Sequence, residues 1–407
     1  MAIADLNGGA FSAPNGRRYD LDWLRAIAFG LLIFYHIGMF YVTWGWHVKS
    51  AYAGPAAEPL MLIVNPWRLA LLFFISGAAV RFATDKAPSL WRFAGSRAFR
   101  LGLPILAGMI VVVAPQSYFQ VRQAGLIEPG YMAFWGDYLN LEQLFPMITP
   151  TWNHLWYVVY LLVYILVITP FLPFLRRFAE GAGGRLFAAM TGGPLRLLLI
   201  IAVPFILYEQ FLSPHFPTTH DLVNDWANHA HRFTIFLVGY FAAKNQRFWR
   251  SVDAALPMAV VLVIGLGVLR LWVREHGEIV FDAEWRAVTV PLMRVVGVYY
   301  AWSFILALFA LAQRYLNRPS GALRYFTGAV FCYYILHQTI IIIAGFYLTQ
   351  LRLGVWPEFL LVTAITVIGC AAGYELLKRI PLLRLFFGIR GKTKKAAPRL
   401  AAVTQSR

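Results

Sequence analysis

Long uncharged blocks of apolar residues recur along the whole sequence and constrain its fold more than any other feature. Most of them run for about 18 to 23 residues, the length that crosses the hydrocarbon core of a bilayer as a helix. The apolar residues do not alternate with polar ones, and backbone amides in lipid must be paired within the segment, so helices are predicted. Charged residues make up only 14% of the 407, whereas a soluble domain carries about 25%. The prediction is an all-α, polytopic transmembrane helical bundle.

The blocks give about ten predicted spans with mostly short connections between them, which leaves no separate soluble domain. We place the spans at 21–42, 64–82, 101–119, 155–175, 195–212, 232–243 (with a start nearer 226 as the alternative), 254–272, 288–313, 326–348 and 357–376. The chain therefore divides into an N-terminal segment at 1–20, a membrane domain at 21–376 and a basic tail at 377–407.

Basic residues are unevenly shared between the two sets of alternate connections. Lys and Arg outnumber Asp and Glu by 36 to 19, a net charge of +17, and the excess lies in the set that includes residues 85–97 and the tail. Because cytoplasmic connections carry the excess of Lys and Arg, both termini are predicted to be cytoplasmic. The charge then reflects topology and attraction to anionic lipid, and no nucleic-acid partner is expected.

The cysteines and paired histidines predict neither disulfides nor a metal site. Cys332 and Cys370 both fall inside predicted spans, so the outer connections have no disulfide framework. His229 and His231 are spaced i, i+2, which does not place them on one helix face. We expect no metal and no permanently bound cofactor.

The first predicted span contains two ionisable residues, Arg25 and His36. An ionisable residue within a span is costly and is a functional candidate by default. The eleven-residue separation is about 1100° of helix rotation, within about 20° of three full turns, so both lie on one face, roughly 16 Å apart along the axis. The alternative is that Arg25 anchors the topology and His36 makes a contact between helices.

Two further histidines are candidates for a site. His337 lies near the middle of the ninth predicted span, where it needs a polar partner or a wet cavity. A hydrogen bond between helices is its structural alternative. His154 opens the fourth predicted span, in Asn153-His154-Leu155-Trp156.

The connection after the second predicted span carries a second basic motif, Arg97 and Arg100. At spacing i, i+3 the two side chains share a helix face. Guanidinium groups suit phosphates because they form paired hydrogen bonds. Ordinary anchoring on the cytoplasmic side is the alternative interpretation.

Together these motifs resemble the acyltransferase-3 family of membrane proteins. The family marks are an Arg and a His separated by ten residues in the first span, matched by Arg25 and His36, and an Arg-x-x-Arg, matched by Arg97 and Arg100. Within the family the chain is most similar to the glucan biosynthesis protein C group, succinyltransferases of osmoregulated periplasmic glucans, over residues 21–390. The chain departs from that group where it has a single histidine, at His337-Gln338, in place of two adjacent ones.

The resemblance implies an enzyme of the bacterial inner (plasma) membrane. It would move a succinyl or acetyl group from cytoplasmic acyl-CoA to a hydroxyl of a periplasmic glucan or another extracytoplasmic carbohydrate. Histidine suits the role of general base because its pKa lies near neutrality, so His36 is the predicted base. Arg25 and His337 are the other predicted catalytic residues. The predicted substrate-binding residues are Arg97, Arg100, His154, Trp156, Trp46 and His47.

Two other functional classes remain as alternatives, a polytopic transporter and a non-catalytic sensor on the same scaffold. No Asp or Glu falls in the middle third of any predicted span, so a carboxylate proton relay is missing. The expected partners are the bilayer, acyl-CoA and the carbohydrate acceptor. The sequence leaves oligomerisation open.

Overall fold

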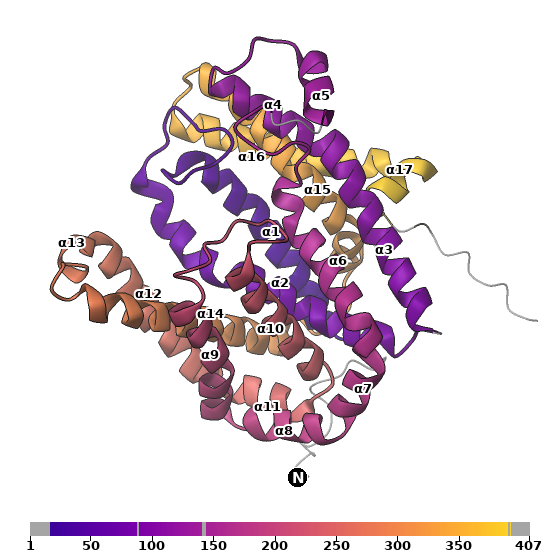
Figure 1. Ribbon diagram of the computed structural model, residues 1–407, viewed down its shortest axis with the longest axis vertical. Coiled ribbons are helices and arrows are strands. Elements are labelled where there is room, and N and C mark those ends of the chain that lie inside the picture. The colour runs from indigo at the N-terminus through magenta and orange to yellow at the C-terminus, as the bar shows by residue number, and fades with distance from the viewer. Residues whose placement is uncertain (1–16, 88, 141–143, 390, 392–407) are drawn as a thin grey trace, which may run out of the picture.

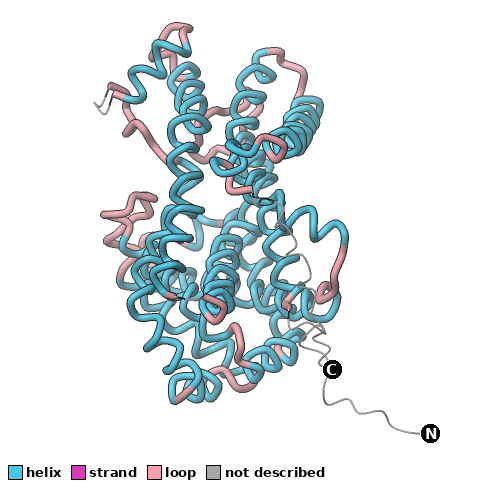
Figure 2. Tube along the Cα trace, turned by 90° about the vertical axis from the view of Figure 1, so that its right-hand side faces the viewer, coloured by secondary structure: helices cyan, strands magenta, loops and turns pink. Residues whose placement is uncertain are grey.

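The computed structural model describes residues 17–87, 89–140, 144–389 and 391, and within these ranges every regular element is a helix. Figure 1 labels the elements and Figure 2 shows the loops that join them. In chain order they are α1 (Tyr19–Tyr41), η1 (Pro55–Ala57), α2 (Glu58–Thr84), α3 (Leu90–Ala107), η2 (Gly108–Val113), α4 (Ala114–Gln123), α5 (Tyr131–Leu139), η3 (Asn153–Leu155), α6 (Trp156–Ile168), η4 (Thr169–Phe171), α7 (Leu172–Glu180), α8 (Ala182–Met190), α9 (Pro194–Phe211), α10 (Trp226–Ala242), α11 (Gln246–Ala254), α12 (Leu256–Glu275), α13 (Gly277–Val280), α14 (Arg286–Tyr315), α15 (Gly321–Gln350), α16 (Val355–Leu377) and α17 (Pro381–Phe386).

Nine helical segments among the described residues are long and apolar enough to cross a membrane. Two of these segments join several elements end to end, at Leu90–Gln123 and Asn153–Glu180. The remaining predicted span, 232–243, is part of α10, which starts at Trp226 and whose 17 residues extend about 26 Å. The prediction of an all-α bundle with about ten spans is therefore confirmed.

Much of the predicted N-terminal segment and of the basic tail lies outside the described residues. Where the structure describes them, α1 already begins at Tyr19, and α17 forms a short helix after the last span and packs against α3.

Helix α1 lies at the centre of the bundle, against α2, α14, α15 and α16. Asp20 and Asp22 in its first turn complement the positive end of the helix dipole. Asp20 also pairs with Arg18 at 2.6 Å, and the Arg18 guanidinium lies 3.8 Å from the centre of the Trp249 ring. These contacts hold the start of α1 against α11. We call the opposite end of the bundle, where α1 finishes, the histidine end.

The backbones of α2 and α10 approach closely at two glycines. A Cβ atom on Gly77 would overlap the carbonyl oxygen of Phe236, and one on Gly239 would overlap that of Phe74. Small residues permit this kind of contact between helices in a membrane. It fixes the position of α2, which borders the site described below.

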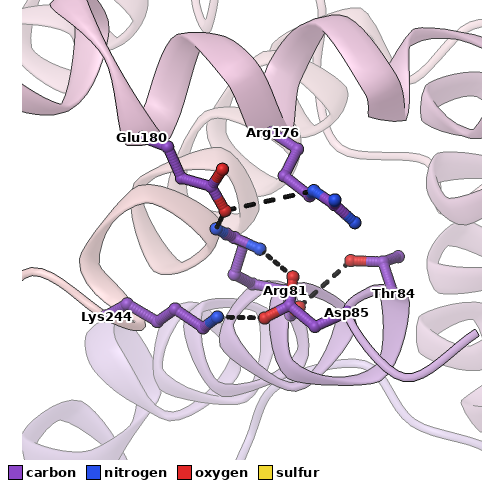
Figure 3. Close-up of polar contacts among 6 residues, drawn as sticks. All are labelled: Arg81, Thr84, Asp85, Arg176, Glu180 and Lys244. Carbon is purple, nitrogen blue, oxygen red and sulfur yellow. Dashed lines mark hydrogen bonds and ion pairs between the residues drawn. The ribbon is translucent and has the colours of Figure 1, made fainter.

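An ion-pair network holds α2, α7 and α10 together at the end opposite the histidine end (Figure 3). Arg81 on α2 is buried and contacts Asp85 as well as Glu180 of α7, the latter at 2.7 Å. Lys244, just after α10, pairs with the same Asp85, and Arg176 lies 4.0 Å from Glu180. Arg81 is the buried member of this network, so Asp85 and Glu180 compensate its charge and connect α2 to α7.

The element η2 is a π-helical turn inside the third long segment. Such a turn disturbs the regular ladder of backbone hydrogen bonds, and side chains from elsewhere bond to its carbonyls. Tyr138 donates to the carbonyl of Met109 at 2.8 Å, and Thr339 of α15 donates to that of Val112 at 2.6 Å. The turn therefore joins α15 to the start of α4, where Gln116 lies.

Candidate active site

A histidine pair between α1 and α15 forms the centre of the candidate site. Nδ1 of His36 lies 2.7 Å from Nε2 of His337, although 301 positions separate the two residues in sequence. The ring planes are nearly parallel, 6° apart, with centroids 5.0 Å apart. His337 is fully buried and His36 is half-buried. The structure thus brings together two of the three predicted catalytic residues.

The contacts of His337 determine which nitrogens carry protons when both rings are neutral. Nδ1 of His337 lies 2.7 Å from the carbonyl oxygen of Tyr334, which only accepts, so this nitrogen must carry the proton. Nε2 of His337 is then an acceptor, and Nδ1–H of His36 donates to it. The lone pair of His36 Nε2 remains, with no hydrogen bond to it among the described residues. His36 is therefore held in the tautomer that a general base requires.

His154 is the third histidine of the cluster, with its ring edge-on to His337 at a centroid distance of 5.2 Å. Its Nε2 lies 3.1 Å from the carbonyl oxygen of Ile335, and its Nδ1 lies 3.3 Å from Nε2 of Gln116. Both ring nitrogens are thus engaged by the protein. His154 therefore ties α15 to α4, and its predicted contact with a substrate stays a prediction.

Two glutamines that sequence reasoning missed connect the cluster to α4. Gln116 is fully buried and donates to Thr339 at 2.8 Å, while its Oε1 accepts from Gln338 at 3.0 Å and from Asn153 at 3.1 Å. Gln116 lies in the predicted third span, and a polar residue inside a span is the signal by which the sequence could have identified it.

The loop after α1 covers the site at the histidine end of the bundle. Trp46 stacks on His36, with ring centroids 6.5 Å apart and planes 26° apart. Nδ1 of His47 lies 2.6 Å from Oε1 of Gln120, and burial lowers the pKa of His47. Lys49 donates to the carbonyls of Met39 and Trp44 at 2.6 and 2.9 Å. These contacts place both predicted binding residues of the loop, Trp46 and His47, next to the histidine pair.

Arg68 of α2 is a buried cation beside the site that sequence reasoning also missed. Its guanidinium carbon lies 3.5 Å from the centre of the ring of Tyr35, the residue before His36. The Tyr35 hydroxyl donates to Oδ1 of Asn65 at 3.1 Å. Arg68 lies within the predicted second span, and an arginine in a span is the signal that would have identified it.

The predicted arginines are not part of the histidine cluster. Arg25 lies towards the start of α1, half-buried, with its Nη2 3.3 Å from Asp22. Arg97 lies 5.2 Å from the ring centre of Phe93, and Arg100 is exposed. Both belong to α3 and not to a connection, because the helix begins well before the apolar block from which the span was predicted.

Trp156 is directed away from the histidine pair. Its ring stacks on His220, with centroids 4.2 Å apart and planes 22° apart. The ring of Trp156 therefore joins α6 to the loop before α10, and its predicted contact with a substrate stays a prediction.

Comparison with known proteins adds a family match over nearly the whole chain. Residues 18–375 match the Acyl_transf_3 family, described as an acyltransferase domain. The Glucans biosynthesis protein C of Escherichia coli strain K12 is 24% identical over 94% of this chain and 97% of the relative. The protein of the same name from Escherichia coli O157:H7 shows the same identity and coverage.

Proposed function

We infer the reaction of this chain from its family, since it belongs to the acyltransferase-3 family. Its helices make it a multi-pass membrane acyltransferase. We propose that it transfers an acyl group, succinyl or acetyl, from cytoplasmic acyl-CoA to a hydroxyl of a periplasmic glucan or a similar extracytoplasmic carbohydrate, in the bacterial inner membrane. The relatives named Glucans biosynthesis protein C support a glucan acceptor. The observation that carries the proposal is the orientation of His36 by His337, which leaves Nε2 of His36 without a hydrogen bond among the residues that the structure describes.

The proposed chemical step uses His36 as the general base. Its Nε2 takes the proton of an acceptor hydroxyl as the hydroxyl oxygen attacks the thioester carbonyl carbon. The C–S bond then breaks, the thiolate of CoA leaves with that proton, and an ester remains on the carbohydrate. While His36 carries the proton, its Nδ1–H donates to His337 and keeps the imidazolium in place. His337 thus acts through His36 as a positioning residue.

The donor is proposed to enter from the end of the bundle opposite the histidine pair. Arg25 and Arg97 both lie near helix starts at that end, because α1 and α3 begin there. The roughly 16 Å between Arg25 and His36 along α1 suits the pantetheine arm of acyl-CoA. Arg97 and Arg100 would bind its phosphates through their guanidinium groups.

We expect the variant Arg97→Ala/Arg100→Ala to raise KM for acyl-CoA more than it lowers kcat. A contact that is equally strong in the ground state and the transition state contributes to substrate binding, so its loss raises KM and leaves kcat largely unchanged. Lys at both positions should rescue only in part, because an ammonium lacks the paired donors of a guanidinium. Steady-state kinetics and donor binding on the folded variants check this. Unchanged donor affinity in the double variant would leave the two residues as topology anchors.

We expect residues 85–89 and the chain after 378 to be cytoplasmic, and the connection at 124–130 to lie outside. The excess of Lys and Arg motivates this orientation. Single cysteines introduced into these connections, in a background with Cys332 and Cys370 replaced by Ala, can be labelled with a membrane-impermeant maleimide on whole cells. Labelling of the 85–89 connection in intact cells would reverse the orientation and contradict transfer across the membrane.

The experiment that tests the proposed function incubates the purified protein with radiolabelled succinyl-CoA or acetyl-CoA and an oligoglucan. Release of CoA with label on the glucan is the expected result. A folded protein that transports the glucan without acylating it would be a transporter. One that binds ligand without transfer or transport would be a sensor.

A further inference from the structure

A cavity of about 720 Å³ with several charged side chains in its wall lies beside the candidate site, between α2, α9, α10, α12 and α14. Its size is in the range of small-molecule binding sites. Basic side chains dominate its charge, with Arg232 from α10, Arg270 from α12 and Arg294 from α14. None of the residues that the sequence predicted for the active site lines it.

The positive charge of the cavity is only partly balanced by the described residues around it, because Glu209 and Asp225 act on Arg232 and Glu209 also acts on Arg294. Glu209 is the single carboxylate among the lining residues, and it lies 3.2 Å from Nε2 of His231. Arg232 donates through Nε to the amide oxygen of Asn228 at 2.9 Å, and Arg270 lies 5.2 Å from the ring centre of Tyr300. No ion pair joins Arg232, Arg270 or Arg294 to a carboxylate in the part of the chain that the structure describes.

Three guanidinium groups around one cavity within a membrane protein favour the binding of an anion. Charges removed from water are costly unless they are paired. The planar donors of Arg match a carboxylate or a phosphate. The cavity is thus suited to a ligand that carries such a group.

The cavity is at the histidine end of the bundle. Arg274 near the end of α12 lies 3.0 Å from Glu58 at the start of α2, and α14 begins after the next connection. Asn65 of α2 lines the cavity and accepts the hydrogen bond from Tyr35, the neighbour of His36. One amide therefore belongs to the cavity wall and contacts the helix that carries the base.

We propose that this cavity binds an acidic substituent, a carboxylate or a phosphate, of the carbohydrate acceptor. The inference rests on the proposed function, because it assumes that the acceptor whose hydroxyl reaches His36 is a sugar. Polar groups of Asn65, Ser213 and Thr218 offer hydrogen bonds to sugar hydroxyls, and Phe205 offers an apolar surface. The arginines would bind the acidic group and so select an anionic acceptor over a neutral one.

Direct binding measurements on the purified full-length protein test this, with glucose 6-phosphate and glucuronate as acidic probes and glucose as the neutral one. We expect saturable binding of the acidic sugars and at least tenfold weaker binding of glucose. Arg232→Gln and Arg294→Gln should each weaken binding of the acidic sugars at least tenfold, and Arg→Lys less. Arg286→Gln is the matched control, because Arg286 is an exposed arginine on the same helix as Arg294 and does not line the cavity.

Several outcomes would overturn the proposal. Equal affinity for glucose and glucose 6-phosphate would do so, as would unchanged affinity in Arg232→Gln and Arg294→Gln proteins that melt at the wild-type temperature. A further measurement compares the stability of the protein in nanodiscs of phosphatidylglycerol with its stability in nanodiscs of phosphatidylcholine. If phosphatidylglycerol alone stabilises the protein through these arginines and no acidic sugar binds, the anion belongs to a lipid headgroup.

His36→Ala separates failure of this inference from failure of the proposed function. The variant should bind acidic sugars as the wild type does, since the cavity does not include the imidazole. Transfer by the wild-type enzyme without binding of acidic sugars would refute the anionic acceptor and leave the transfer reaction intact.

Discussion

His36→Ala should abolish transfer while leaving the protein inserted, folded and able to bind acyl-CoA. A general base contributes about 10²–10⁴-fold to a rate, so loss of the Nε2 lone pair should lower kcat by that factor. The measurement is transfer per folded molecule, with donor binding determined on the same preparation.

The size of the effect distinguishes catalysis from packing. If His36 only joined α1 to α15, its removal should cost on the order of 1 kcal/mol of assembly stability. Yield would then fall while specific activity was kept. Cys332→Ala is a suitable control, because Cys332 is buried on α15, the helix that His36 contacts, but packs against Tyr374 and Ala329, away from the histidines. Substantial transfer by folded His36→Ala would contradict the assignment of the base.

The membrane fold could be predicted from the sequence because its cause is local. A block of apolar residues must form a helix wherever it crosses lipid, so the spans follow from hydropathy alone. The predicted resemblance to the acyltransferase-3 family is likewise confirmed. The helix that carries Arg97 was not predicted in full, because its amphipathic first turns precede the apolar block.

The partners of the site could be predicted only in part. Arg25 and His36 lie on one helix, so their common face follows from spacing, whereas the contact of His36 with His337 joins residues 301 positions apart. The contacts of Gln116 depend on the π-helical turn of η2, which shifts the register of α4 and leaves no signal in hydropathy. Trp156 shows the limit of sequence proximity, since it lies two residues from His154 yet contacts His220.

Replacing His337 with Phe should lower kcat by on the order of 10²–10⁴-fold although His337 touches no substrate in the proposed reaction. The imidazole accepts from Nδ1–H of His36 and is itself fixed by the carbonyl of Tyr334. Without this acceptor His36 loses both its orientation and its tautomer, and the wrong tautomer of a catalytic histidine is known to cost about 10⁴-fold. Because the proposed donor site lies at the other end of the bundle, KM for acyl-CoA should change little.

The amide variants at position 337 separate the acceptor role from simple burial. The side chain of Gln is long enough to place its oxygen near the position of Nε2, so His337→Gln should recover part of kcat. Asn is too short, so His337→Asn should resemble His337→Phe in activity. If the role of His337 were purely structural, activity would instead follow the melting temperature of each variant and the volume of the side chain at position 337. A kcat near the wild-type value for folded His337→Phe would therefore remove His337 from the mechanism and leave His36 to be held by Trp46 and α1 alone.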